Sequence, residues 1–474
     1  MTEDVTDGPV SKVDLSADRH DGVGAKLTVV IAFVGMFVTV LDSNAVNVAL
    51  PTIGRQLSAG VVGLQWVVDA YLLMFAALML SAGTVSDRVG ANRTLTGGLA
   101  VFTVTSAACA LAPNIAFLVA ARVAQGGAAA LMLPASLSLV HQAFEDPAAR
   151  AKGIAVWSMG GGAAITSGPV IGGILTSTFG WRAIFLVNVP ICVAGMFGAA
   201  RARSTRPAPA RLDFPGQVCA GLAVAALTFA IIQGGSARFS PLVIGALVIF
   251  AAALVAFLAI EGRTRHPAVP LSLFRAPGFA VCTIAGFSLN FAFYGILFML
   301  TLYFQNTRGA TALETGLMFL PLTALIVVMN MVAGRLAARY GPKLPLVLGQ
   351  VIQAAGLLGL LTITPDTPTI RLLALLIPHG VGGALALPAL ASAGLERVDA
   401  RRSGVASGIL NVARQVGSAL GVAGFGALIG MTTGFMTALW LSLAIGAAIQ
   451  LATAAGCLFL LRRGTPERAE SAQA

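Results

Sequence analysis

The segment SMGGGAAITSGPVIGG, residues 158–173, places six glycines and one proline within a long apolar run. In a water-soluble helix each glycine costs about 1 kcal/mol relative to alanine, and a proline costs about 3 kcal/mol. Between helices in a bilayer, small residues instead allow two backbones to approach closely. Neighbouring helices there can also compensate for the hydrogen bond that a proline removes. The segment therefore predicts a bent membrane helix that packs closely against its neighbours.

The composition of the whole chain is that of a membrane protein. Its 474 residues are 57% hydrophobic and only 10% charged, with a mean hydropathy of +0.87. Soluble domains carry about 25% charged residues. Apolar runs long enough to span a bilayer recur throughout the chain. We expect fourteen spans, at about residues 27–50, 61–82, 95–112, 115–141, 153–176, 183–200, 216–234, 241–260, 279–303, 315–336, 344–363, 370–393, 404–429 and 436–460.

Lysine and arginine are distributed unequally between alternate loops. With the N-terminus in the cytoplasm, the cytoplasmic segments hold 23 of the 30 basic residues and the outer segments hold 5, while Arg122 and Arg414 fall inside spans. Cytoplasmic loops of membrane proteins are enriched in these residues. Both termini are therefore expected in the cytoplasm, and the net charge of +11 is assigned to loops rather than to nucleic-acid binding.

The five cysteines form no CxxC pair, and we expect no metal site.

The two ends of the chain resemble each other weakly. GTVSDRVG (83–90) matches GRLAARYG (334–341), GGAAALMLPASLSL (126–139) matches GVGGALALPALASA (380–393), and KGIAVWS (152–158) matches SGVASGI (403–409). Duplicated halves with a site between them are typical of transporters. The expected organisation is a disordered tail (1–26), a six-helix half (27–200), a linker (201–215), two extra helices (216–260), a linker (261–278), a second six-helix half (279–460) and a tail (461–474).

Several motifs, in order, carry a resemblance to a known family. They are LDSNAVNVALP (41–51), GTVSDRVGANR (83–93), LVAARVAQGGAAA (118–130), GPVIGG (168–173), GWRAIFLVNVP (180–190) and LNVARQVGSALG (410–421). Together they resemble the major facilitator superfamily, in its fourteen-helix drug:proton antiporter branch, and are similar to antibiotic exporters of the methylenomycin-resistance type. The resemblance implies an all-α integral membrane fold of two six-helix halves plus two central helices. It also implies export of small amphiphilic drugs or antibiotics by alternating access, in exchange for protons.

Asp42 and Asp69 lie in otherwise apolar spans, in TVLDSNAV and WVVDAYLL. A charge at a helix centre costs about 2.5–3.5 kcal/mol on insertion scales, and such residues commonly serve ion or substrate pathways. We therefore expect both acids to take part in proton coupling, and the resemblance adds Arg122 through a neighbouring carboxylate. The alternative is that these acids and Arg122 or Arg414 form structural ion pairs.

The resemblance assigns roles to two further motifs. A cytoplasmic gate is implied for Gly83, Asp87, Arg88, Gly90 and Arg93, although Ala91 and Asn92 replace part of the family's basic cluster. A closing helix that seals the outer side is implied for Gly161, Gly168, Pro169, Gly172 and Gly173. Because Gly161, Gly168 and Gly172 share one helical face, that face is expected to pack against the opposite half. The alternatives are a solvated turn and ordinary close packing.

Other polar and aromatic residues inside spans are candidates for the wall of a substrate cavity. They are Asn290, Phe291, Tyr294, His379, Asn411 and Arg414. Plain packing, a structural histidine and an ion pair of Arg414 are the alternatives.

Other function classes lack their motifs. The chain has no GxSxG, HExxH or phosphate-binding loop, so an enzyme or an ATP-driven pump is not expected. An exporter of an endogenous metabolite or organic anion, an importer, and a membrane sensor stay as alternatives. No cofactor is expected beyond the proton gradient. The expected partners are a small-molecule substrate, protons and lipid, with a monomer in the bacterial cytoplasmic membrane.

Overall fold

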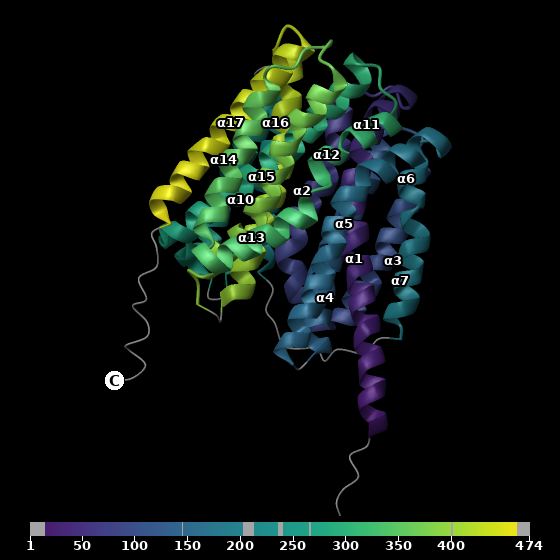
Figure 1. The fold of residues 1–474 in the computed structure, drawn as a ribbon, viewed down its shortest axis with the longest axis vertical. Coiled ribbons are helices and arrows are strands. Elements are labelled where there is room, and N and C mark those ends of the chain that lie inside the picture. Colours follow the sequence, from purple (N-terminus) through teal and green to yellow (C-terminus); the bar gives the residue numbers. More distant parts are fainter. Residues whose placement is uncertain are drawn as a thin grey trace, which may run out of the picture.

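The computed structural model describes residues 15–144, 146–201, 213–235, 240–264, 267–399 and 402–461. All regular elements in this part of the chain are helices, and most of them run along the long axis of one bundle (Figure 1). The predicted all-α fold is confirmed.

The helices form two groups joined by a helical pair. The first group is α1 (Leu15–Gln56), α2 (Val61–Val89), α3 (Ala91–Ala110), α4 (Ile115–Ala143), α5 (Pro147–Phe179), α6 (Arg182–Leu186) and α7 (Asn188–Ala199). The connecting pair is α8 (Phe214–Gly234) and α9 (Pro241–Arg263). The second group is η1 (Leu271–Arg275), α10 (Pro277–Leu302), η2 (Tyr303–Thr307), α11 (Ala312–Met318), α12 (Leu320–Thr323), α13 (Ile326–Tyr340), α14 (Lys343–Leu360), α15 (Thr369–Leu395), α16 (Ser403–Met431) and α17 (Phe435–Leu460).

Thirteen helical segments of the described chain are long and apolar enough to cross a membrane. They correspond to thirteen of the fourteen predicted spans. The remaining one, predicted at 95–112, is α3, which packs beside α4 and α7 in the first group. Arg93 and a series of threonines lower the hydropathy of α3, so its role as a fourteenth span stays a prediction.

Three helix boundaries differ from the expected spans. The first helix begins at Leu15 rather than near residue 27, so residues 15–26 are helical and only 1–14 of the predicted tail lie outside the described residues. A helix already formed by an apolar span extends easily, because each added residue gains one backbone hydrogen bond. The sixth predicted span is divided into α6 and α7, and the tenth into α11, α12 and α13. Pro190 and Pro321, which lack a backbone N–H, lie next to these breaks.

The backbone shows the same local feature in both halves. Gly90 ends α2 with φ of 96°, and Gly341 ends α13 with φ of 82°. L-residues rarely adopt such angles, and glycine adopts them without strain. The two glycines occupy the last position of the two matched motifs, GTVSDRVG and GRLAARYG. The sequence repeat therefore corresponds to a repeated turn between paired helices.

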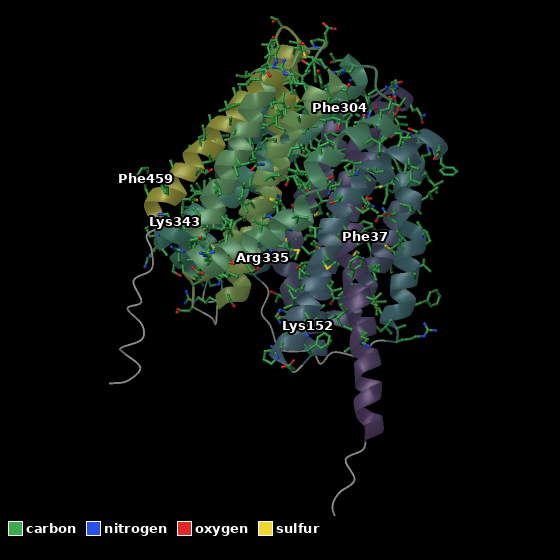
Figure 2. The ribbon with its side chains drawn as sticks, viewed as in Figure 1. Phe37, Lys152, Phe304, Arg335, Lys343 and Phe459 are labelled. Carbon is green, nitrogen blue, oxygen red and sulfur yellow. The ribbon has the colours of Figure 1, made fainter. Side chains whose placement is uncertain are left out.

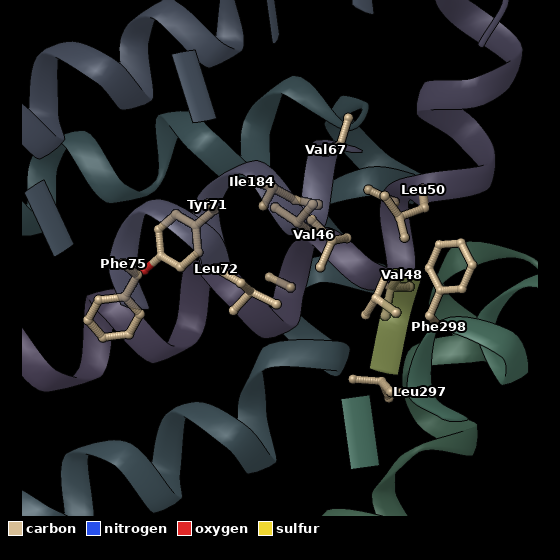
Figure 3. Close-up of a cluster of buried hydrophobic side chains, with 14 of the residues drawn as sticks. Val46, Val48, Leu50, Val67, Tyr71, Leu72, Phe75, Ile184, Leu297 and Phe298 are labelled. Atoms are coloured by element: carbon tan, nitrogen blue, oxygen red, sulfur yellow. The ribbon is translucent and has the colours of Figure 1, made fainter. Parts of the chain in front are cut away.

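The largest apolar core joins the two halves. Figure 3 shows Val46 and Leu50 of α1, Tyr71 of α2, and Leu297 and Phe298 of α10 in one cluster. A second cluster lies within the second half, around Phe279 and Leu390. Because one core spans both halves, they are held together over part of their length, and any cavity between them must lie elsewhere.

Candidate functional site

A cavity of about 1260 Å³ lies between the two halves. Both halves and the α8–α9 pair contribute to its wall, and its lining includes Gly83, Asp87, Leu133, Pro134, Trp157, Asp213, Gln217, Glu261, Ser407 and Asn411. It reaches the exposed Asp87 near the end of α2. Figure 2 shows Lys152 low in the view and Phe304 high, with Arg335 and Lys343 towards the lower part of the second half. The cavity therefore opens at the end that the charge distribution predicts to be cytoplasmic.

At the opposite end the two halves are in contact. The Gln305 amide donates to the Val48 carbonyl oxygen at 2.7 Å, joining the second half to α1. The Thr166 hydroxyl of α5 donates to the Thr323 carbonyl oxygen at 3.0 Å, and the Leu313 N–H donates to Ser177 Oγ at 3.1 Å. We call these contacts of α5 with α11 and α12, and of α1 with η2, the seal. The molecule is thus open at one end and closed at the other.

Asp42 is buried at the centre of a hydrogen-bonded network in the first half. Its carboxylate forms an ion pair with Arg122. It also accepts hydrogen bonds from the Asn188 amide at 2.8 Å and the Gln125 amide at 3.1 Å. These contacts bring α1, α4 and α7 together. The predicted residues Asp42 and Arg122 therefore meet directly, and Asn188, which the sequence analysis missed, is a third member.

The Arg122 guanidinium contacts several groups besides the Asp42 carboxylate. Its Nε donates to the Val67 carbonyl oxygen at 3.0 Å, its terminal NH1 donates to Gln125 Oε1 at 2.8 Å, and the guanidinium carbon lies 4.2 Å from the centre of the Tyr71 ring. Only 1% of Arg122 is exposed. A charge this deeply buried is tolerated because carboxylate, carbonyl and ring all face it.

Asp69 has the opposite environment. It is completely buried, and neither carboxylate oxygen has a hydrogen-bond partner among the described residues. One turn earlier on α2, the Gln65 amide donates to the Ala423 carbonyl oxygen of α16 at 2.8 Å. Residues four apart share a helical face, so Asp69 lies on the boundary between the halves. An unpaired carboxylate in such a place costs several kcal/mol.

The six candidates for the cavity wall are dispersed. Asn411 lines the cavity, and Arg414, one turn further along α16, donates to Asn411 Oδ1 at 3.2 Å. Tyr294 lies beside the side chains of Ser43, Asn44 and Arg414 and so connects the halves. The other three candidates, Asn290, Phe291 and His379, do not line the cavity of this conformation.

Asn290, Phe291 and His379 belong to the packing of the second half. The Asn290 amide donates to Ser418 Oγ at 3.2 Å, and Phe291 packs edge-on against Phe425. His379 is buried and stacks on Phe293, with ring centres 6.0 Å apart. The spacing of aromatic residues on α10 could not distinguish a cavity wall from a helix interface, because both require one apolar face.

The gate motif lies at the cavity end of α2. Asp87, Arg88 and Arg93 are exposed, Gly83 has open space where a side chain would be, and Gly90 forms the turn described above. Among the described residues Asp87 has no ion-pair partner. Partial burial raises the pKa of the Asp87 carboxyl above its ordinary value. The motif is therefore unlatched in this open conformation.

The closing-helix glycines pack against two different helices, some against α1 and one against α11. A Cβ at Gly168 would lie 2.8 Å from Asn44 Cβ, one at Gly172 would lie 2.6 Å from the Ala45 carbonyl oxygen, and Gly161 faces Met36. This face packs on α1 of the same half, so the prediction that it packs against the opposite half is wrong. The reason is that α1 and α5 are neighbours along most of their length.

The opposite half is instead contacted by the adjacent positions. A Cβ at Gly173 would lie 2.6 Å from the Ala312 carbonyl oxygen of α11, and the Pro169 carbonyl oxygen lies against Gly316. Close backbone contact between the halves is therefore made at the seal by Gly173 and Pro169.

The chain is similar in sequence to a known protein family and to several of its members. The profile of the family described as Major Facilitator Superfamily matches residues 32–422. The chain is 36% identical over 427 residues to the methylenomycin A resistance protein of Streptomyces coelicolor, covering 89% of each chain. It is 34% identical over 412 residues to the tetracenomycin C resistance and export protein of Streptomyces glaucescens, covering 86% of this chain and 76% of that one.

Two further matches agree with these. The multidrug resistance protein Stp of Mycobacterium tuberculosis is 36% identical over 406 residues, which are 85% of this chain and 75% of that protein. A crystal structure of a bacterial homologue of the human lysosomal transporter Spinster superposes with a TM-score of 0.64 at 16% identity, covering 94% of this chain and 99% of that one. The last comparison concerns the fold alone.

Proposed function

Because the chain belongs to the major facilitator superfamily, we propose that it is a proton-coupled exporter of small amphiphilic drugs or antibiotics. It is a multi-pass membrane protein of a transporter family whose relatives are named for antibiotic resistance and drug efflux. The observation that carries the proposal is the cavity of about 1260 Å³ between the halves, open at one end and closed by the seal at the other. A substrate enters this cavity from the cytoplasm and leaves when the seal opens and the lower end closes.

Proton coupling is assigned to Asp69 and to the Asp42–Arg122 pair. Among the described residues Asp69 has no counter-ion, and it lies one turn from Gln65, which contacts the second half. A proton removes its charge while it is buried, and an opening at the seal would expose it to water. A carboxyl that binds a proton from one side and releases it to the other exchanges protons for substrate. The Asp42–Arg122 ion pair is assigned to the same coupling step through its direct contact in the first half.

The remaining assignments follow the charge distribution and the family. Both termini are assigned to the cytoplasm, because the loops on the side of the N-terminus hold 23 of the 30 basic residues. The transporter is assigned as a monomer in the bacterial cytoplasmic membrane that uses the proton gradient and no cofactor, and it catalyses no covalent reaction. The α8–α9 pair fills the side of the bundle next to α2 and α16.

Inside-out membrane vesicles with an acidic interior test the proposal. A panel of antibiotics and cationic dyes is added to vesicles that contain the wild-type protein, and the internal pH is followed. A substrate is expected to dissipate the gradient with the wild type and with the exposed-acid control Asp366→Asn, but not with Asp69→Asn. Correctly folded wild type that moves no member of the panel would contradict drug export. Drug movement without proton movement would contradict the coupling.

A further inference from the structure

Two acidic side chains meet at the base of the α8–α9 pair, outside the network of Asp42 and Asp69. Asp213 immediately precedes α8, and Glu261 lies in the last turn of α9. Only 8% of Asp213 and 3% of Glu261 is exposed, yet both line the cavity. Buried carboxyl groups are uncommon unless they are paired with a cation or share a proton.

The two carboxyl groups lie close together and accept hydrogen bonds from two stretches of backbone. Asp213 accepts from the Gly216 N–H at 3.1 Å and from the Ala268 N–H at 3.4 Å, while Glu261 Oε1 accepts from the Val269 N–H at 3.2 Å. Asp213 Oδ2 and Glu261 Oε1 both face Gly216. Two carboxyl groups can hydrogen-bond to each other only when one of them carries a proton.

The glycine between them shows how close they are. A Cβ at Gly216 would lie 2.7 Å from Asp213 Oδ2 and 3.0 Å from Glu261 Oε1. Any side chain at this position would therefore contact both carboxyl groups and separate them.

No cation compensates this pair within the described residues. The ion pair that the described residues form joins Arg122 and Asp42, which belong to α4 and α1 and not to the α8–α9 pair. The described charged residues of α9, of the end of α2 and of the cavity wall are exposed: Arg263, Asp87, Arg88, Arg275 and Arg402. Arg402 donates instead to Ser272 Oγ at 3.2 Å. Two ionised carboxylates this close, buried and without a cation, would repel each other strongly.

Polar atoms around the pair are also left without partners. Glu261 Oε2 is buried and has no hydrogen-bond partner within the part of the chain that the structure describes. The Gln217 side chain, one turn after Asp213, is 8% exposed, lines the cavity, and makes no side-chain hydrogen bond among the described residues. Because Gln217 and Glu261 both line the cavity, an exchanging proton or a hydrating water would be held beside them.

We propose that Asp213 and Glu261 share one proton and form a second proton-binding site, separate from Asp42 and Asp69. The proton exchanges with water in the cavity past Glu261 Oε2 and Gln217. When it leaves, two negative charges remain in contact, and the ends of α8 and α9 separate from the backbone at Ala268 and Val269, which leads into α10. The site gives the two extra helices a role, and it does not depend on which substrate is exported.

Infrared titration of the purified protein in lipid nanodiscs tests this site without any transport measurement. The carbonyl band of protonated carboxylic acids and the band of ionised carboxylates are followed with pH in the wild type, Glu261→Gln, Asp213→Asn and the exposed-acid control Asp366→Asn. At neutral pH, Glu261→Gln is expected to lose one protonated carboxyl and leave Asp213 ionised. In either single variant the remaining carboxyl ionises at a lower pH than the shared pair does.

The control and a second perturbation make the outcome decisive. Asp366→Asn should lose one ionised carboxylate and keep the protonated band unchanged. Gly216→Ala keeps both acids but separates them, and it should move their protonation towards that of isolated carboxyls. The proposal is overturned if Glu261→Gln and Asp213→Asn each behave like Asp366→Asn at neutral pH, because both acids would then be ionised in the wild type.

Discussion

At the scale of single residues, the buried charges in this protein differ in what balances them. Asp42 has Arg122, Asn188 and Gln125 around it, whereas Asp69 has no partner among the described residues. Sequence spacing treats the two acids alike, because each is one acid in an apolar helix. Their surroundings differ: Asp42 contacts side chains of three helices of one half, and for Asp69 we propose that a proton removes the charge.

A double-mutant cycle tests the Asp42–Arg122 pair. Arg122→Gln leaves the Asp42 carboxylate buried without a cation, and we expect it to lower stability by about 3–5 kcal/mol. Adding Asp42→Asn to Arg122→Gln removes that charge, so the double variant should be more stable than Arg122→Gln alone. Thermal unfolding of the purified proteins in one detergent measures the ranking. Additive losses would show that the two side chains do not interact.

At the scale of the elements, α5 has two contact faces that differ by a single residue. Gly172 packs on the backbone of α1 in its own half, and Gly173 packs on the backbone of α11 in the opposite half. Contact between backbones cannot be relieved by rotating a side chain, so a Cβ at either position must displace a helix. An alanine substitution at Gly172 therefore tests packing within one half, and the same substitution at Gly173 tests closure of the seal.

Gly172→Ala is expected to lower the stability of the protein by about 1–3 kcal/mol, as overpacking of a core does. Gly173→Ala is expected to leave stability nearly unchanged and to loosen the seal. Thermal unfolding measures the first effect. Labelling of a cysteine at Val48 by an impermeant maleimide, in a background without native cysteines, measures the second. Equal destabilisation by both variants, with no gain in labelling, would mean that α11 does not close on α5 as described.

At the scale of the whole molecule, the halves share an apolar core (Figure 3) and direct hydrogen bonds at one end, and a cavity separates them at the other. Alternating access requires the seal to open during each cycle, while contacts inside a half are kept. Inter-half contacts should therefore be intolerant of cross-linking, and intra-half contacts should tolerate it.

Paired cysteines test this requirement. Ser177→Cys with Leu313→Cys joins α5 to α11 across the seal, where the Leu313 N–H and Ser177 Oγ are 3.1 Å apart. Its disulfide should abolish transport, and reduction should restore it. The matched control, Asn290→Cys with Ser418→Cys, lies within the second half, where the two polar atoms are 3.2 Å apart. The control should stay active when oxidised. Full activity of the oxidised seal pair would rule out opening at this end.

Much of the architecture was predictable, because it depends on local properties. Hydropathy located thirteen helical segments that the structure contains, and α3 was recognised as a helix despite its lower hydropathy. The repeat of GTVSDRVG in GRLAARYG anticipated the paired turns at Gly90 and Gly341. The breaks next to Pro190 and Pro321 were missed, because a proline in a membrane helix can equally produce a bend that preserves the span.

The sequence by itself determined that this protein is a membrane transporter of two related halves with charged residues inside its spans, since composition, periodicity and repeats are readable along the chain. Only the tertiary structure decided that Arg122 pairs with Asp42, that Asp69 has no partner among the described residues, that Gly173 rather than Gly172 meets the other half, and that Asp213 and Glu261 lie together around Gly216. The physical reason is that these properties depend on which helix faces which. A difference of one residue on a helix turns a side chain by about 100° and changes its neighbour.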